Sequence, residues 1–167
     1  MNIKPAFAIA LGLLFSAPIF AQKTETRTLS DFNKISISGG FDKVTVAEGN
    51  ETSVKITASG VDLNKILTET HGQTLEIGMK NGSYWDTKIN LVITFKNLEE
   101  INSSGSTDIL VDRLRAEHFT FNGSGSGDFS GDFDVKKLEI NLSGSSDTHL
   151  KGRAEQQEIN ISGSGDV

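Results

Sequence analysis

A repeated unit in the second half of the chain, (Ile/Phe)-Asn-x-Ser-Gly-Ser-x-Asp, constrains the fold more than any other feature. Four copies align without gaps, and their final aspartates are 20, 19 and 19 residues apart. The copies are Ile101–Asp108, Phe121–Asp128, Ile140–Asp147 and Ile159–Asp166. A degenerate copy, Ile35–Asp42, ends on an aspartate in the same way. A fixed period of about twenty residues is typical of folds that stack one supersecondary unit on the next.

Apolar and polar residues alternate within the units, as in Leu138–Leu142 and Glu158–Ile161, which is the period of a strand. The chain has 17 glycines and 2 prolines, which favours strands and tight turns. The sequence therefore predicts an all-β chain, folded as a single-stranded right-handed β-helix or β-solenoid with one repeat per coil. Each strand would pair in parallel with its equivalent about 4.8 Å away, so that identical side chains stack in columns.

The columns of such a solenoid have structural roles. Ile101, Phe121, Ile140 and Ile159 are predicted to form an inward apolar column, and the rest of the core is expected from Val111, Phe129, Phe133, Val135 and Leu150. Stacked asparagines can bond amide to amide, and the glycines supply the positive φ that a corner needs.

The region before the first complete copy is less regular. Alternating strands are predicted around Val44–Val46, Val54–Ile56, Leu75–Ile77 and Ile89–Ile93. The sequences Glu48-Gly49-Asn50 and Asn81-Gly82 are typical of hairpin turns. We therefore expect some antiparallel pairing in the N-terminal half, and a short helix within Val61–Glu69.

The first 21 residues are typical of a secretory signal peptide. Lys4 is followed by an apolar stretch, Ala6–Phe15, and Ala21 offers a small residue for cleavage. We expect a signal peptide at 1–21 and one β-solenoid domain at 22–167, incomplete at its C-terminus because the sequence stops within a repeat. The apolar stretch is too short for a comfortable membrane span, and none is expected after cleavage. The protein is predicted to be exported, to the periplasm, the outer-membrane surface or the medium.

The net charge of −6 argues against nucleic acid as a partner, because binding to phosphates requires a basic surface. The chain has no cysteine, so it has no disulfide framework and no thiol for lipid attachment. An uncovered terminal coil would favour self-association.

The combination of the leader, Phe41–Val46, Leu75–Ile77 and the Ser-Gly-Ser-x-Asp repeats resembles the family described as "putative auto-transporter adhesin, head GIN domain". The resemblance covers nearly the whole chain after the leader. It implies an exported protein of Gram-negative bacteria with a β-helical fold. It carries over no catalytic residue, because the family has no established active site.

The aspartates that end the repeats are the most tempting metal ligands. Carboxylates at one corner could share calcium, and the candidates are Asp108, Asp128, Asp147 and Asp166. The favoured interpretation is a turn residue that bonds its own backbone, because calcium-binding β-rolls have a nine-residue period. No metal site is therefore predicted, and calcium remains the minority hypothesis.

Catalytic and cofactor-binding residues are not predicted. The Gly123–Gly127 loop lacks the lysine of a phosphate-binding loop, and the three histidines, His71, His118 and His149, lack metal-ligand spacing. No serine lies in a nucleophile elbow. We expect a non-enzymatic protein.

The predicted function is an adhesin-like binding or structural module of the cell envelope, with a glycan or a cell-surface protein as partner. The alternatives are a polysaccharide lyase-like β-helix and a calcium-dependent glycan-binding β-helix. For a lyase, the basic residues Lys136, Lys137, Lys151 and Arg153 are expected to lie near the aspartate corner. Tyr84 and Trp85 could stack on a sugar or be buried at the end of the stack.

Overall fold

The computed structural model describes residues 22–164 and 166, and these residues form an all-β fold, as expected. The predicted signal peptide lies outside the described residues. The strands are β1 (Lys23–Thr28), β2 (Lys34–Gly39), β3 (Lys43–Glu48), β4 (Ser53–Ser59), β5 (Ile66–His71), β6 (Thr74–Met79), β7 (Lys88–Phe95), β8 (Glu100–Gly105), β9 (Ile109–Gly125), β10 (Phe129–Gly144) and β11 (Thr148–Gly163). Where a short helix was expected, only Leu63–Lys65 forms a 3₁₀ turn, because Ile66 already begins β5.

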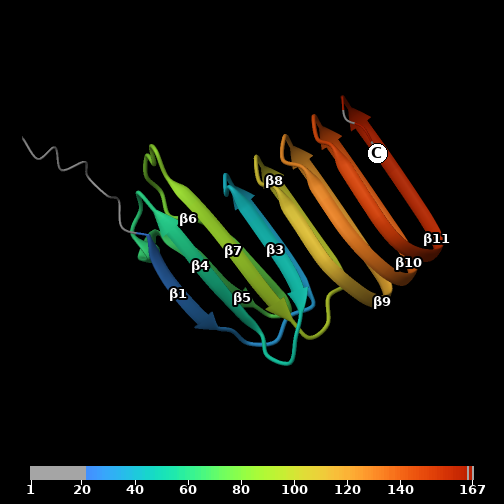
Figure 1. The fold of residues 1–167 in the computed structure, drawn as a ribbon, viewed down its shortest axis with the longest axis horizontal. Coiled ribbons are helices and arrows are strands. Elements are labelled where there is room, and N and C mark those ends of the chain that lie inside the picture. The colour runs from blue at the N-terminus through green and yellow to red at the C-terminus, as the bar shows by residue number, and fades with distance from the viewer. Residues whose placement is uncertain (1–21, 165, 167) are drawn as a thin grey trace, which may run out of the picture.

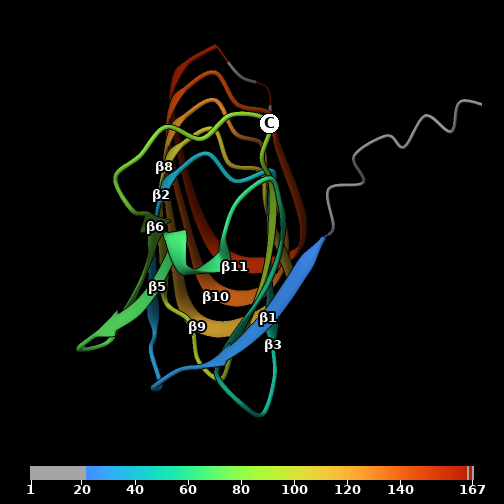
Figure 2. The same cartoon turned by 90° about the vertical axis from the view of Figure 1, so that its left-hand side faces the viewer.

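All eleven strands belong to one curled sheet (Figures 1 and 2). The strands β9, β10 and β11 run the full width of the curl and bend in the middle, at Glu117, Lys136 and Glu155, where the ladders are interrupted. Each therefore has a first limb before the bend and a second limb after it. The first limb of β9 pairs with β3, and the sheet continues through β7, β4 and β1. The second limb pairs with β8, and the sheet continues through β2, β6 and β5.

The prediction of a single-stranded right-handed β-helix is wrong. The chain forms a mixed parallel and antiparallel half-barrel sheet, in which β1–β4, β4–β7 and β5–β6 are antiparallel pairs. Two physical reasons account for the difference. Short hairpins insert antiparallel strands into the first half, and the turns between the long strands, such as 126–128, contribute no strand that would close the third side. The antiparallel pairing expected in the N-terminal half is present.

The copies of the repeat lie on neighbouring strands at equivalent positions. Ile101 pairs with Phe121, Phe121 with Ile140, and Ile140 with Ile159, and the degenerate copy joins the same row through Ile35. These side chains point between the two limbs, where the core lies, and the first three are almost completely buried. A one-residue slip would turn every one of them to solvent, so burial fixes the register.

Phenylalanines fill the core where the two limbs of the long strands face each other. The ring of Phe129, on the first limb of β10, stacks on Phe121, on the second limb of β9, with centroids 3.7 Å apart and planes 8° from parallel. Phe119 and Phe133 form a second stacked pair at 5.3 Å. Of the predicted core, Val111, Phe129, Phe133 and Val135 are buried, whereas Leu150 on β11 is only partly covered.

A β-bulge accounts for the one spacing of 20 residues among spacings of 19. Val111 pairs with Gly131 and Leu114 with Phe133, so β9 has two residues, Asp112 and Arg113, where β10 has one. Arg113 adopts the left-handed conformation, with φ of 51°, as the extra residue of the bulge. After the bulge both strands return to the same register, which keeps the asparagines and serines aligned.

Candidate functional site

The second limbs of the long strands, together with β8, carry two parallel columns of polar side chains on their outer face. The asparagine column consists of Asn102, Asn122, Asn141 and Asn160, and the serine column of Ser104, Ser124, Ser143 and Ser162. Along each strand, the residues of the two columns alternate with residues that point inward, and side chains two residues apart share a face of the sheet. The buried apolar row therefore places the polar columns on the surface.

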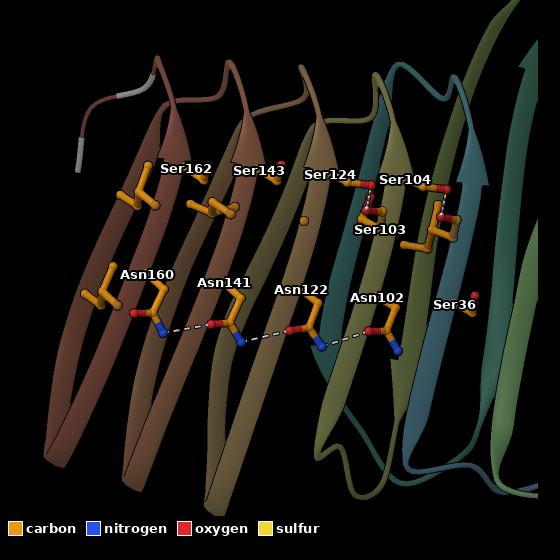
Figure 3. A pocket seen from close by; sticks show the side chains of 15 residues that line it. Ser36, Asn102, Ser103, Ser104, Asn122, Ser124, Asn141, Ser143, Asn160 and Ser162 are labelled. Atoms are coloured by element: carbon orange, nitrogen blue, oxygen red, sulfur yellow. Dashed lines mark hydrogen bonds between the residues drawn. The ribbon is translucent and has the colours of Figure 1, made fainter.

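The asparagines form a continuous hydrogen-bonded ladder (Figure 3). The Nδ2 of Asn122 donates to the Oδ1 of Asn102 at 2.8 Å, Asn141 donates to Asn122 at 2.9 Å, and Asn160 donates to Asn141 at 3.0 Å. Every bond points in the same direction, from β11 towards β8. The amide stacking expected from the sequence is thus present, and its polarity leaves the Oδ1 of Asn160 at the β11 edge.

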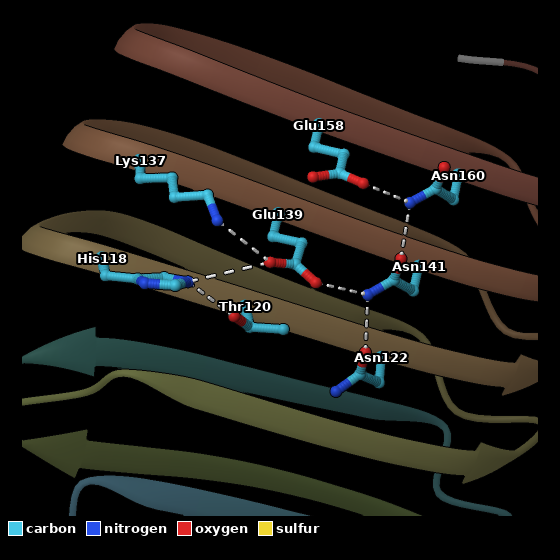
Figure 4. A network of polar contacts seen from close by, with 8 residues as sticks. All are labelled: His118, Thr120, Asn122, Lys137, Glu139, Asn141, Glu158 and Asn160. Carbon is cyan, nitrogen blue, oxygen red and sulfur yellow. Dashed lines mark hydrogen bonds and ion pairs between the residues drawn. The ribbon is translucent and has the colours of Figure 1, made fainter.

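Carboxylates beside the ladder accept the second amide hydrogen. Asn141 also donates to Glu139 at 3.2 Å and Asn160 to Glu158 at 3.3 Å, whereas Asn102, which only accepts within the ladder, donates to Glu100 at 2.8 Å. Figure 4 shows Glu139 and Glu158 of this second row, with Thr120 at the equivalent position on β9. Asn141 and Asn160 each donate to two acceptors, which fixes the orientation of their amide groups.

Cations neutralise part of this carboxylate row. The Nζ of Lys34 lies 2.7 Å from Glu100, and the hydrogen bond from Lys34, followed by that from Asn102, lowers the pKa of Glu100. Glu139 lies 3.6 Å from Lys137 and 4.0 Å from the Nε2 of His118 (Figure 4). The ladder is therefore bordered by ion pairs rather than by bare negative charge.

An open groove of about 740 Å³ follows the two columns across β2, β8, β9, β10 and β11. Its lining contains only amide, hydroxyl and aliphatic side chains and one glycine, and no charged residue. Such a surface can donate and accept hydrogen bonds at regular intervals without charge selection. It is suited to a neutral ligand rich in hydroxyl groups. The sequence predicted the stacked asparagines, but not that a groove would follow them.

The aspartates lie at the turn that precedes each long strand and link one turn to the next. The Oδ1 of Asp108 accepts the backbone N–H of Asp128 at 3.0 Å, Asp128 accepts that of Asp147 at 3.1 Å, and Asp147 accepts that of Asp166 at 3.3 Å. The predicted turn role was thus incorrect in one respect, because each side chain bonds the backbone of its neighbour and not its own. Among the described residues, no three His, Cys, Asp or Glu side chains are grouped to hold a metal.

The basic residues considered for a lyase do not gather at the aspartate turn. Lys136 and Lys137 lie at the opposite bend, eight and nine residues along an extended strand from Asp128, or roughly 26 Å or more. There Lys136 pairs with Glu117 at 2.7 Å, which raises its pKa. Arg153 lies 3.7 Å from Asp134 on the outer face of the first limb.

The remaining candidates are dispersed. The three histidines lie on different strands: His71 on β5, His118 on β9 and His149 on β11. Trp85 is 83% exposed in the loop before β7, so the alternative of a buried end-cap is wrong for this residue. The hydroxyl of neighbouring Tyr84 donates to the carbonyl of Lys80 at 2.7 Å, which holds the loop together.

A curled β-sheet with a laddered, uncharged outer groove defines the class of protein: an all-β domain with a polar, grooved outer surface. The chain belongs to the family described as "Putative auto-transporter adhesin, head GIN domain", whose model matches residues 31–167. The resemblance found in the sequence is thereby confirmed. A comparison with curated proteins gave no match.

Several solved structures of bacterial proteins share the fold. A "Putative lipid binding protein" from Parabacteroides distasonis has a TM-score of 0.64 and 19% identity, over 86% of this chain and 72% of that one. A "putative adhesin" from Bacteroides fragilis has a TM-score of 0.60 and 14% identity, over 89% of this chain and 97% of that one. A "putative cell adhesion protein" from Clostridium sporogenes has a TM-score of 0.57 and 16% identity, over 87% of this chain and 97% of that one. These descriptions are of adhesins and binding proteins and not of enzymes, and at these identities the likeness shows the fold alone.

Proposed function

We propose that the protein is an exported, adhesin-like binding domain of the cell envelope that binds a glycan along its asparagine and serine columns and performs no catalysis. The observation that carries the proposal is the uncharged groove of about 740 Å³ with its fixed amide ladder. The family description supports an adhesive role and a location at the cell surface or outside the cell.

A glycan is favoured over a protein partner by the chemistry of the groove. Carbohydrate hydroxyls both donate and accept hydrogen bonds, as do the carboxamide and hydroxyl groups of the columns. The strands follow one another at about 4.8 Å, so an extended ligand with regularly spaced hydroxyls would meet equivalent groups on successive strands. A protein surface would have to match this repeat with its own side chains.

The predicted leader at 1–21 supports export, with the domain beginning at residue 22, and the periplasm, the outer-membrane surface and the medium are all compatible destinations. Among the described residues, no helix is long and apolar enough to cross a membrane.

The test is binding of the purified protein to an array of neutral and acidic glycans, with one variant that fills the groove. Ser143→Trp places an indole among the exposed serines. Thr45→Trp places the same group on the outer face of β3, which pairs with the first limb of β9, away from the groove. We expect wild type and Thr45→Trp to bind the same glycans, and Ser143→Trp to bind at least about tenfold more weakly. The proposal would be contradicted if the wild-type protein bound no glycan on the array. It would also be contradicted if both variants folded and Ser143→Trp bound glycans as tightly as the wild-type protein.

The two alternatives predict different results. A lyase would release unsaturated products, detected by their absorbance, from uronic acid polymers supplied with calcium. A calcium-dependent glycan-binding domain would lose its ligand on chelation, and replacement of Asp128 and Asp147 by Asn would weaken calcium binding. No observation on the described residues favours either alternative over glycan binding by the groove.

A further inference from the structure

The asparagine ladder ends on β8 with an unused donor. A carboxamide has two N–H donors, and in Asn141 one bonds a glutamate on the same strand while the other bonds the asparagine of the neighbouring strand. Asn102 makes only the first of these bonds, to Glu100, and among the described residues nothing accepts its second hydrogen. The Nδ2 of Asn102 lies on the side of β2, where Ser36 is the paired residue (Figure 3). The ladder therefore offers a donor towards β2.

Ser36 makes β2 the short rung of the asparagine column. It pairs with Asn102 on one side and with Glu76, on β6, on the other. Because neighbouring strands are about 4.8 Å apart, Asn102 and Glu76 lie two strand spacings from each other, or roughly 9.6 Å between their backbones. The serine side chain between them is too short to continue the ladder as an asparagine would. The groove includes this short rung, because Ser36 and Ile37 belong to its lining.

The two side chains that flank the short rung have opposite hydrogen-bonding roles. Asn102 donates, and the bonds of the ladder all point the same way, so each amide polarises the next and strengthens the donor at this end. The carboxylate of Glu76, exposed on the outer face of β6, only accepts. A hydroxyl would have to make both bonds through one oxygen. A trans secondary amide has its C=O and N–H on opposite sides and repeats the geometry of the ladder.

We propose that the short rung binds the acetamido group of an N-acetylated amino sugar. The C=O of the acetamido group accepts from Asn102 and its N–H donates to Glu76, so the ligand supplies the amide that β2 lacks. The inference rests on the proposed binding of a glycan by the groove and names the class of sugar. A peptide amide has the same shape, but the hydroxyls of a sugar also match the serine column.

The serine column continues past the short rung, whereas the asparagine column does not. Ser38 on β2 pairs with Ser104 on β8, and it lies two residues, or about 6.6 Å, along the strand from Ser36. The Oγ of Ser104 donates to the carbonyl of Ile37 at 3.5 Å, which leaves its lone pairs as acceptors for ligand hydroxyls. A single sugar with its acetamido group at Ser36 therefore has hydroxyl partners on the same two strands.

Two oligosaccharides that differ only in this group test the proposal. An oligomer of N-acetylglucosamine should bind at least about tenfold more tightly than the glucose oligomer of the same linkage and length, as measured by titration calorimetry. Equal affinities, or no binding of the N-acetylated oligomer, would overturn the acetamido site. If Ser143→Trp then weakened the binding of other glycans, the proposed function would stand and this inference alone would fail.

A matched pair of substitutions at the short rung locates the site. Ser36→Asn fills the rung with the protein's own carboxamide, whereas Ser36→Ala leaves it short. We expect Ser36→Asn to weaken binding of the N-acetylated oligomer by about tenfold and to raise the midpoint of urea unfolding, because it accepts the second hydrogen of Asn102. Ser36→Ala should bind as the wild type does. Wild-type affinity in a folded Ser36→Asn protein, or an equal loss in both variants, would overturn the proposal.

The acceptor on β6 has its own control. Glu76→Lys replaces the acceptor by a donor and should weaken binding of the N-acetylated oligomer by about tenfold. Glu69→Lys makes the same charge change at the residue of β5 that pairs with Glu76, one strand further from the groove, and should leave the affinity unchanged. Equal losses in the two variants would mean that net charge rather than a hydrogen bond matters here, which would contradict the proposed role of Glu76.

Discussion

The two halves of the sheet differ in how their strands pair and in what specifies the pairing. From β8 to β11, successive strands lie side by side in parallel, with asparagine beside asparagine and glycine beside glycine. From β1 to β7 the strands are short, three pairs are antiparallel, and the order β1-β4-β7-β3 departs from that of the chain. Identical side chains specify the pairing in the repeated half. In the other half, hairpin turns and burial of apolar residues specify it.

The degenerate copy on β2 lies where the two halves meet. Ile35 and Gly39 pair with Ile101 and Gly105 in the same columns as the complete copies. Ser36, however, occupies the position of the asparagine, and the ladder of amides ends at Asn102. The apolar and glycine columns thus continue into the first half, while the asparagine column does not. The amide ladder is therefore confined to the repeated half, whereas both halves share the apolar and glycine columns.

The largest expected effect compares a stacked phenylalanine in the core of the repeated half with a buried valine in the core of the first half. Phe129→Ala should lower the free energy of unfolding by about 3–5 kcal/mol, because the ring is fully buried and stacked on Phe121. Val44→Ala, in the same row on β3, should cost roughly 2 kcal/mol, since fewer buried methyl groups are lost. The midpoints of urea unfolding measure both. Equal losses would mean that the aromatic stack adds nothing.

The glycine column allows a matched pair of substitutions. Gly125 and Gly39 both have positive φ, at 129° and 119°, but a Cβ on Gly125 would clash with the carbonyl oxygen of Gly105, whereas one on Gly39 meets nothing. We expect Gly125→Ala to cost about 3 kcal/mol and Gly39→Ala about 1 kcal/mol, the backbone penalty alone. Unfolding in urea distinguishes them. If the two costs are equal, close stacking of the turns is not what requires glycine.

The amide ladder should contribute less than the core. Asn141→Ala removes the bonds to Asn122 and Glu139 and the acceptor for Asn160, at an expected cost of about 1 kcal/mol because the groups are half exposed to water. Ser36→Ala, at the equivalent position on β2, should change stability by less than about 0.5 kcal/mol. Thermal unfolding of both variants checks the difference. A neutral Asn141→Ala would indicate that the ladder serves binding alone.

The smallest effect concerns acid stability where the halves meet. The pKa of Glu100 is lowered from 4.5, first by the hydrogen bond from Lys34 on β2. Because the folded pKa is below the unfolded one, this contribution is fully present above pH 4.5 and is lost as the pH falls through the folded pKa. Glu100→Gln should flatten that part of the stability profile, and Lys34→Gln should do the same. An unchanged acid slope in both variants would exclude the pair as its source.

Where the repeat is complete, the sequence alone predicts which residues of neighbouring strands pair. The alignment of Ile101, Phe121, Ile140 and Ile159 predicted their row, and the asparagines beside them predicted the ladder, because a strand period of two leaves no other arrangement. The groove was not predictable, since its depth depends on how the strands curve. The separation of Lys136 from Asp128 was missed for a related reason, because sequence distance does not reveal where a strand bends.

By itself, the sequence determined the all-β class, the in-register columns of the second half and the family, because repeated side chains at a fixed period specify both strand register and common descent. Only the tertiary structure decided that the sheet remains a half-barrel rather than a closed helix. Closure depends on whether the Ser-Gly turns add a third strand and on where the hairpins of the first half insert β1, β4 and β5. Both are settled by packing between segments far apart in the chain, which no local pattern records.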